Sequence, residues 1–336
     1  MSIYDEKYDI RQANIDDIDD IMTYICVNWK SDHILGKDRE FFEYEHVFDS
    51  KVNFIIAREK DNNEIKGIIG YLYASYDKTK NDIWTVMWMV SPRVIPLLGL
   101  RLFEKVRELT KARSIIGVGD NPETTVPMMK AYYKFFTGKL EHYYMLSDRD
   151  EYCIAKISYK PDCRIQSDDS TLVKKCDRNT LGHAFDFDRY AERVPYKDAT
   201  FFIHRYIDHP IYKYDIYVLR NDQHSALLVT REQHMNGSVA LRIIDYYGDL
   251  DPIKGMKRFW EQQLEKYEYV DFYCLGIEED ILLETGFAKI KEDDENIIPD
   301  YFNPYVAENI NIYCTSSCNN TIFCKGDADQ DRPSQR

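Results

Sequence analysis

The segment from Trp84 to Phe103 carries the clearest candidate chemistry in the sequence. An apolar run that ends at Val90 predicts a buried strand, a proline-containing loop follows, and Gly99 stands at the mouth of a predicted helix. Backbone N–H groups at a helix start have no acceptor within the helix, and the helix dipole adds positive potential, so this position favours an anion such as a pyrophosphate. Gly99 would let such a ligand approach the backbone closely. The alternative is a strand–loop–helix unit without a ligand, since such units are common in α/β proteins.

Hydrophobic periodicity predicts the elements that would position this segment. Over residues 8–158 the pattern indicates strands and helices in the order β α β β β α β α β β. A polar stretch at 161–170 predicts a linker, and the same order of elements recurs beyond it. We therefore expect an α+β protein of two tandem units, 1–162 and 168–330. Each would have a central mixed, mostly antiparallel sheet flanked by helices.

Composition argues against several classes of function. The 336 residues include 44 Lys+Arg and 58 Asp+Glu, so the net charge is −14. Such a surface repels phosphate backbones and anionic lipids, and we expect neither nucleic acid nor membrane as a partner. Prolines and arginines interrupt the longest apolar stretch, and the first residues lack the pattern of a signal peptide, so we expect a cytoplasmic protein. Eight cysteines without a CxxC pair predict free thiols and no metal site.

The order of elements and the strand–loop–helix segment resemble the GCN5-related N-acetyltransferase (GNAT) superfamily of acyl-CoA-dependent N-acyltransferases. The family signature in this loop is Arg/Gln-x-x-Gly-x-Gly/Ala. Here Arg93 precedes the loop, and Pro96 and Leu98 stand in the places of the signature glycines. Gly99 is the glycine that remains, one residue late. Further along, 117–121 and 129–136 are similar to the family's fifth strand with its Asn and to its Tyr-bearing fourth helix.

The second unit resembles the family in part. Residues 281–287 are similar to the family's helix-ending Leu-x-x-x-Gly-Phe element, although Leu282 stands where a tyrosine is expected. The loop 248–251 is acidic and has no phosphate-binding glycines, so it would repel a pyrophosphate. We therefore expect a degenerate second unit without a CoA site. The ending 323–333 resembles chains encoded among bacterial surface-polysaccharide genes, and a solvated acidic tail is the alternative interpretation.

The resemblance implies acetyl-CoA or another acyl-CoA as co-substrate and no metal. In the family, a bulged central strand offers a backbone N–H to the thioester carbonyl oxygen, and a tyrosine of the fourth helix protonates the departing thiolate. Tyr133 is the first candidate for that acid and Tyr132 the second. His142, on the next predicted strand, is a candidate base or else a hydrogen-bonded structural histidine. The expected cofactor-binding residues are Met89, Val90, Arg93, Leu98, Gly99, Leu100, Arg101 and Asn121.

Three hypotheses for function follow. The first is an acyl-CoA-dependent N-acyltransferase whose second unit shapes the acceptor site. Its acceptor would be an amino sugar, free or nucleotide-linked, in surface polysaccharide biosynthesis. The second is an aminoacyl transferase similar to the peptidoglycan-bridge enzymes, although the charge of −14 argues against a tRNA substrate. The third is a non-catalytic GNAT-fold binding protein. All three hypotheses are compatible with a homodimer.

Overall fold

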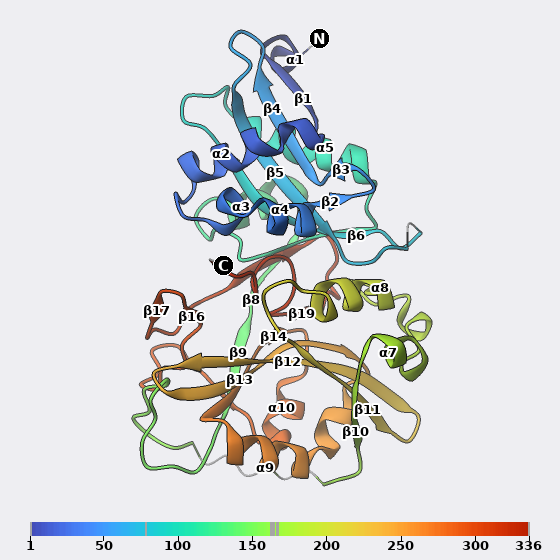
Figure 1. Ribbon diagram of the computed structural model, residues 1–336, viewed down its shortest axis with the longest axis vertical. Helices are drawn as coiled ribbons and strands as arrows, with labels where there is room; N and C mark the ends of the chain where they lie inside the picture. Colours follow the sequence, from blue (N-terminus) through green and yellow to red (C-terminus); the bar gives the residue numbers. More distant parts are fainter. Residues whose placement is uncertain (1, 78, 162–164, 166–167, 335–336) are drawn as a thin grey trace. The chain divides into compact units, whose positions relative to one another are not determined.

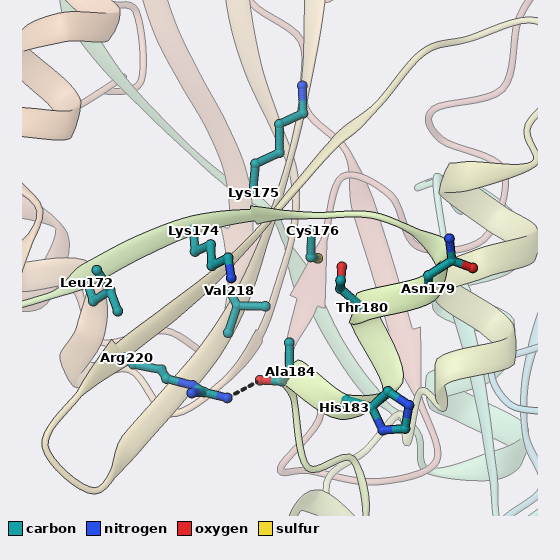
Figure 2. A pocket seen from close by; sticks show the side chains of 10 residues that line it. All are labelled: Leu172, Lys174, Lys175, Cys176, Asn179, Thr180, His183, Ala184, Val218 and Arg220. Carbon is teal, nitrogen blue, oxygen red and sulfur yellow. Dashed lines mark hydrogen bonds between the residues drawn. The ribbon is translucent and has the colours of Figure 1, made fainter.

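The computed structural model describes residues 2–77, 79–161, 165 and 168–334 (Figure 1). The chain forms two units, Met1–Gly117 with Arg332–Arg336 and Val118–Asp331. The expected boundary lay later, at 162–168, a segment mostly outside the described residues.

The boundary falls early because the chain contributes a strand to the second sheet before residue 162. Glu141–Leu146 (β9) pairs antiparallel with Tyr269–Leu275 (β14) and with Ala288–Lys289 (β15). The segment predicted as the last strands of the first repeat therefore belongs, by its hydrogen bonds, to the second unit.

Five strands of the first unit pair in the order β1-β4-β5-β6-β7. The first four are antiparallel neighbours, and β6 and β7 are parallel. Most of β4 and β7 is buried without alternation, which is typical of strands covered on both faces. The strands are β1 (Tyr8–Gln12), β4 (Phe54–Glu59), β5 (Ile65–Tyr73), β6 (Asp82–Val90) and β7 (Ser114–Val118).

Helices cover both faces of this sheet (Figure 1). Asn14 caps the first turn, η1 (Ile15–Asp17), through its side chain. The predicted apolar stripe of the helix that follows is buried at Ile18, Ile21 and Ile25. The helices on one face are α2 (Ile18–Asn28), α3 (Ile34–Lys37) and α4 (Arg39–His46), with α5 (Leu98–Thr110) on the other; α1 (Ile3–Lys7) and the hairpin of β2 (Val47–Phe48) and β3 (Lys51–Val52) lie at the ends.

The second unit repeats this pattern of strand directions. Its sheet has the order β10-β11-β12-β13-β14-β9-β15, and β13 and β14 are the parallel pair. The expected α+β architecture, with a mixed and mostly antiparallel sheet in each unit, is confirmed. The remaining strands of this sheet are β10 (Leu172–Cys176), β11 (Asp215–Asn221), β12 (His224–Met235) and β13 (Ser238–Gly248), while β8 (Phe136–Lys139) pairs with β18 (Tyr313–Ser316), β16 (Tyr301–Phe302) with β17 (Tyr305–Val306), and β19 (Phe323–Cys324) with β14.

An apolar cluster centred on the buried Trp260 fills the core on one side of the second sheet. Trp260 lies on α9 (Lys257–Lys266) and packs edge-to-face against Phe287, which follows α10 (Glu279–Thr285). The helical segments of this unit are α7 (Arg178–Ala184), η3 (Asp188–Tyr190), α8 (Ala199–Phe202), η4 (Ile203–Ile207), η5 (Asp251–Gly255), α9 (Lys257–Lys266) and α10 (Glu279–Thr285).

Two predicted elements were wrong in detail. The pattern over 153–158 predicts a strand, but the N–H groups of Cys153, Ile154 and Ala155 donate instead to the buried carboxylate of Glu268, at 2.8–3.0 Å. A helix predicted over 127–136 consists of α6 (Thr125–Met128) and the wider turn η2 (Met129–Tyr133). It ends before Lys134, whose φ is 58°.

The described part of the chain contains no helix long and apolar enough to cross a membrane. Within the same residues, no group of three or more His, Cys, Asp and Glu side chains could hold a metal ion. The described cysteines are free thiols, and Cys163 lies outside the described residues.

Candidate active site

The central strand of the first unit is bulged. Pairing between β5 and β6 passes from Ile68↔Met89 to Gly70↔Val86, so Met87 and Trp88 together face one residue of β5. Met87 has φ 48°, which no regular strand residue adopts. The expected bulge in this strand is confirmed, and it lies immediately before Met89 and Val90, the two expected cofactor-binding residues of the strand.

Beyond the bulge, one edge of β6 is open. The pairing of β6 with β7 ends at Thr85↔Gly117, while its pairing with β5 continues. The N–H of Ser91 donates to the carbonyl of Lys66 at 2.8 Å, and antiparallel pairs alternate in the direction of their N–H groups. The N–H of Val90 therefore points away from β5, toward the open edge. That of Met89 faces β5, so Val90 is the better candidate of the two for a ligand-binding N–H.

The start of α5 offers backbone donors. Within the described chain, the N–H groups of Gly99 and Leu100 have no acceptor, and no side chain caps the helix. Leu97, at the N-cap, has φ 65° and a side chain that is 56% exposed. No acidic residue stands in the first turn. A 13-residue helix with open donors and positive end potential has the properties of an anion site.

The loop before α5 is fixed to the rest of the first unit. The hydroxyl of Tyr24 lies 2.9 Å from that of Ser91, and the hydroxyl of Tyr4 donates to the carbonyl of Pro96 at 2.7 Å. Arg93, in this loop, has φ 63°, is exposed and makes no ion pair with any described residue. A cation without a counter-ion beside a helix start adds to the attraction for an anion.

The side chain of Trp88 explains why a glycine stands at position 99. A Cβ on Gly99 would lie 3.3 Å from Nε1 of Trp88, whose ring stacks on Phe103 at a centroid distance of 5.3 Å. The indole fills the space at this α-carbon, so our expectation that Gly99 leaves room for a ligand was wrong in that respect. Leu98 is buried, and Arg101 pairs with Glu108 at 3.0 Å. A ligand role for Leu98, Gly99, Leu100 and Arg101 stays a prediction.

The corresponding helix start in the second unit is closed. The N–H of Lys257 donates to the carbonyl of Asp168 at 3.0 Å, and that of Arg258 donates to the carboxylate of Asp169 at 2.7 Å. A carboxylate of the chain itself thus takes a donor of the first turn of α9. Among the described residues, no such side chain caps α5.

The second sheet also has a bulged central strand with an open edge. The pairing of β12 and β13 shifts register so that Ile244 is the extra residue of β13. The parallel pairing of β13 with β14 ends one residue earlier along β13, at Ile243. Both sheets therefore open between their parallel strands within two residues of the bulge.

The chain itself fills this opening in the second unit. Residues Phe323–Asp331, called here the C-terminal segment, begin as β19 on the edge of β14. The N–H of Gly326 donates to the carbonyl of Ile244 at 2.6 Å, and that of Lys325 to the carbonyl of Tyr273 at 3.1 Å. The segment thus bridges β13 and β14 at the bulge. A Cβ on Gly326 would lie 3.0 Å from the Ile244 carbonyl oxygen, so the close approach requires glycine.

Charged side chains of the C-terminal segment complete buried ion pairs. They correct the interpretation of this ending as a solvated acidic tail. Burial of an unpaired charge is costly, so each pair holds the segment in place. The pairs are Lys325 with Asp300 (2.7 Å), Asp327 with Lys197 (2.7 Å) and Asp331 with Arg231 (2.8 Å).

The candidate residues after β7 belong to the second unit. The side chain of Asn121 accepts hydrogen bonds from the N–H groups of Glu123 and Thr124, at 2.9 and 3.0 Å, and so shapes its own loop. Tyr132 is 61% exposed, and the half-buried Tyr133 lies 5.9 Å from Phe135 between ring centroids. Roles of Asn121, Tyr132 and Tyr133 toward a ligand stay predictions.

His142 does not border an open cleft. It is 5% exposed, its ring stacks on Tyr273 at 3.7 Å, and its Nε2 lies 3.1 Å from the carboxylate of Asp271. Burial lowers the pKa of His142, although the Asp271 charge opposes this effect. The structure favours the structural histidine over the catalytic base. His209 is similarly enclosed: it is buried, and its ring stacks on Tyr212.

One carboxylate that the sequence pattern does not indicate, that of Asp120, has suitable properties for a base. Asp120 is the second residue after β7 and stands three residues after Gly117, the partner of Thr85. Its carboxylate accepts a 2.6 Å hydrogen bond from the hydroxyl of Thr315. Desolvation raises the pKa of Asp120 to about 6. Nothing in the local sequence signals this, because Thr315 is distant in the chain.

No family model and no curated protein sequence matches the chain. Solved structures do resemble it. A GCN5-related N-acetyltransferase from Anabaena variabilis superposes with a TM-score of 0.56 at 9% sequence identity, covering 92% of this chain and 72% of that one. N-myristoyltransferase of Saccharomyces cerevisiae, solved with myristoyl-CoA and inhibitors, gives a TM-score of 0.45 at 10% identity, with 94% and 80% covered. A putative acetyltransferase from Pyrococcus horikoshii gives 0.43 at 12% identity, with 94% and 90% covered.

Proposed function

On the premise that this chain has the fold of the GCN5-related N-acetyltransferases, we propose that it is an acyl-CoA-dependent N-acyltransferase whose first unit binds the acyl donor. The observation that carries this proposal is the open start of α5 beside the bulged strand β6. The N–H groups of Gly99 and Leu100, with the charge of Arg93, would hold the pyrophosphate of CoA. The Val90 N–H would receive the thioester carbonyl oxygen.

The reaction needs little covalent chemistry from the protein. An amine attacks the thioester carbonyl carbon, and the carbonyl oxygen becomes an oxyanion that the Val90 N–H stabilises. A base removes the extra proton of the amine. The C–S bond then breaks, and the thiolate receives a proton, a role that we propose for Tyr133. Holding the two substrates together contributes several kcal/mol, on the order of 7–11 kcal/mol at best.

Only one acyl-donor site is proposed, in the first unit. In the second unit, Asp169 caps the equivalent helix start, and the C-terminal segment occupies the opening at the bulge. Acetyl-CoA should therefore bind with a stoichiometry of one per chain in calorimetry. Saturation at 100 times Kd should raise the free energy of unfolding by about 2.7 kcal/mol. Absence of any such stabilisation would favour a non-catalytic protein.

We propose an amino sugar as the acceptor, on the basis of the sequence resemblance. Release of CoA thiol should be measured with glucosamine, a nucleotide-linked amino sugar and an N-terminal peptide amine side by side. Activity confined to the peptide would contradict the amino sugar and leave the acyl-donor site intact.

Leu97→Asp tests the anion site without disturbing the core. Because Leu97 is exposed and has a left-handed backbone, aspartate should be tolerated there at least as well as leucine. Its carboxylate would stabilise the start of α5 by about 0.5 kcal/mol while repelling a pyrophosphate. We expect an unchanged or slightly higher melting temperature, and an affinity for acetyl-CoA at least about tenfold weaker, or 1.4 kcal/mol.

The matched control is Leu109→Asp, which adds the same charge near the other end of α5, where leucine is 42% exposed. This variant should bind acetyl-CoA as the unaltered protein does. Equal weakening by both variants would mean that net charge, not the helix start, governs binding.

We propose Asp120 as the base that takes the proton of the amine, and Asp120→Asn tests this role. With a pKa of about 6, Asp120 is mostly ionised at pH 7 and can accept the proton of the amine. We expect kcat/KM to rise as the pH increases through about 6. Asp120→Asn should remove that limb and lower turnover about 10²-fold. The amide keeps the shape and can still bond to Thr315, so stability should change little. If kcat/KM of the variant still rose with pH through about 6, another residue would be the base.

A further inference from the structure

The first unit contains a cavity that acyl transfer, as proposed above, does not use. Its volume is about 300 Å³, which is typical of the smaller ligand sites. Asn81, which precedes β6, and Thr110, the last residue of α5, both line it. The open start of α5 lies at the other end of the same elements. Along the 13 residues of α5, at about 1.5 Å per residue, the two ends lie roughly 18 Å apart.

One wall of the cavity is aromatic. Phe48, on the hairpin of β2 and β3, lies 4.9 Å from Tyr76 and 6.4 Å from Tyr73 between ring centroids, tilted by about 60° in both cases. Phe48 is 38% exposed, so part of its ring is available for contact. In Figure 1 this hairpin lies beside the start of β6. Such a wall favours a ligand with a flat apolar face.

The cavity lining also includes a polar group, the side-chain amide of Asn53, which favours a ligand that can form hydrogen bonds. Asn53, between β3 and β4, lines the cavity and is only 6% exposed. Within the described residues its side chain makes no hydrogen bond, although an amide can make up to four. The polar atoms of this amide are not sealed from solvent, so they reach the open space of the cavity, where a ligand can bond to them. Gln12 and Ser75 add polar groups to the lining.

The charges at the rim restrict the ligand further. Asp49 and Asp77 line the cavity, and Lys51 is the one cation among the described lining residues. The balance is negative, so a phosphate or carboxylate group would be repelled. The ligand should carry no negative charge, and it should combine hydroxyl groups with an apolar face.

We propose that this cavity binds an uncharged sugar ring. The C–H face of a pyranose would pack on Phe48, and its hydroxyl groups would bond to the Asn53 amide and to the carboxylates at the rim. This site is distinct from the acyl-donor site at α5. It would hold a monosaccharide, free or as one residue of a longer glycan.

The test uses saturation-transfer NMR on the whole chain with D-glucose, N-acetyl-D-glucosamine and glucose 6-phosphate. At least one of the two uncharged sugars should show transfer to its ring C–H protons with a Kd of about 10 mM or tighter, and glucose 6-phosphate should bind at least about tenfold more weakly. Asn53→Leu should abolish binding and change the melting temperature little, because no hydrogen bond to another described residue is lost with the amide. Phe48→Ala, at an exposed position, should also abolish binding.

Trp29→Ala, which removes another exposed aromatic of the first unit (63% exposed), is the control and should bind as the unaltered chain does. Absence of transfer to both uncharged sugars would overturn the proposal, as would binding that survives both Asn53→Leu and Phe48→Ala. A longer glycan as the ligand would appear as tighter binding of a disaccharide with the same loss in both variants. Acetyl-CoA binding, measured in parallel, reports on the other site and is unaffected by either result.

Discussion

Replacement of Arg242 by methionine is expected to lower the free energy of unfolding by about 3–5 kcal/mol. Arg242 is 2% exposed in its side chain and donates to the carboxylate of Asp271 at 2.8 and 3.1 Å and to that of Asp300 at 2.7 Å. Methionine keeps much of the volume but leaves both carboxylates with fewer partners. Urea denaturation of the purified variant measures the effect.

The stability that Arg242→Met loses should become smaller as the pH falls. Burial alone would raise the pKa of Asp271, but the Arg242 charge and the His142 hydrogen bond bring it below its usual value. In the normal chain, this contribution is present above the unfolded pKa of about 3.9 and is lost as the pH falls below it. In Arg242→Met, burial prevails and the folded-state pKa rises, so the carboxylate takes up a proton at higher pH. The difference in free energy of unfolding between the two proteins should therefore become smaller as the pH falls from 7 to about 4.

An exposed ion pair provides the comparison. Lys160 lies 2.9 Å from Asp148, but both side chains are largely in solvent. Lys160→Met should leave the stability unchanged, since exposed pairs are screened. If Arg242→Met were equally harmless, the buried network would not be what holds this part of the second unit together.

Most of the fold could be predicted because the periodicity is strong where packing is strongest. The apolar runs of β4, β6 and β7 and the stripe of α2 are signals that burial imposes directly on the sequence. Pairing partners could not be predicted in the same way. An alternating or apolar pattern over 141–146 indicates an extended segment, but the strand that accepts it, β14, lies more than a hundred residues further along the chain.

The candidate site was predictable to the same degree. Apolar residues, prolines and Gly99 located the strand, the loop and the helix start, but the contact of Gly99 with Trp88 depends on how the indole packs. The burial of the C-terminal segment could not be predicted at all. Its acidic composition favours solvent, and only its pairing with distant cations, such as Arg231 with Asp331, explains why it is buried. Charge composition says nothing about partners that folding brings together.

Tyr133→Phe is expected to lower turnover by about 10²- to 10⁴-fold, as for other positioned acids. The substitution keeps the half-buried ring and its packing near Phe135 and removes only the hydroxyl. Without a proton donor, the thiolate must leave unprotonated, so the loss should fall on kcat, while the affinity for acetyl-CoA should change little. Thiol release in the presence of an amine acceptor measures the effect.

Tyr132→Phe is the matched control, because it removes the same atom from the adjacent residue. Adjacent residues of a helical turn point in different directions, so both hydroxyl groups cannot serve the same sulfur. Tyr132 is 61% exposed, and its phenylalanine variant should keep full activity. Loss in Tyr132→Phe with full activity in Tyr133→Phe would move the acid by one residue. Full activity in both would show that neither tyrosine protonates the thiolate, and the proton would then have to come from solvent or from another side chain.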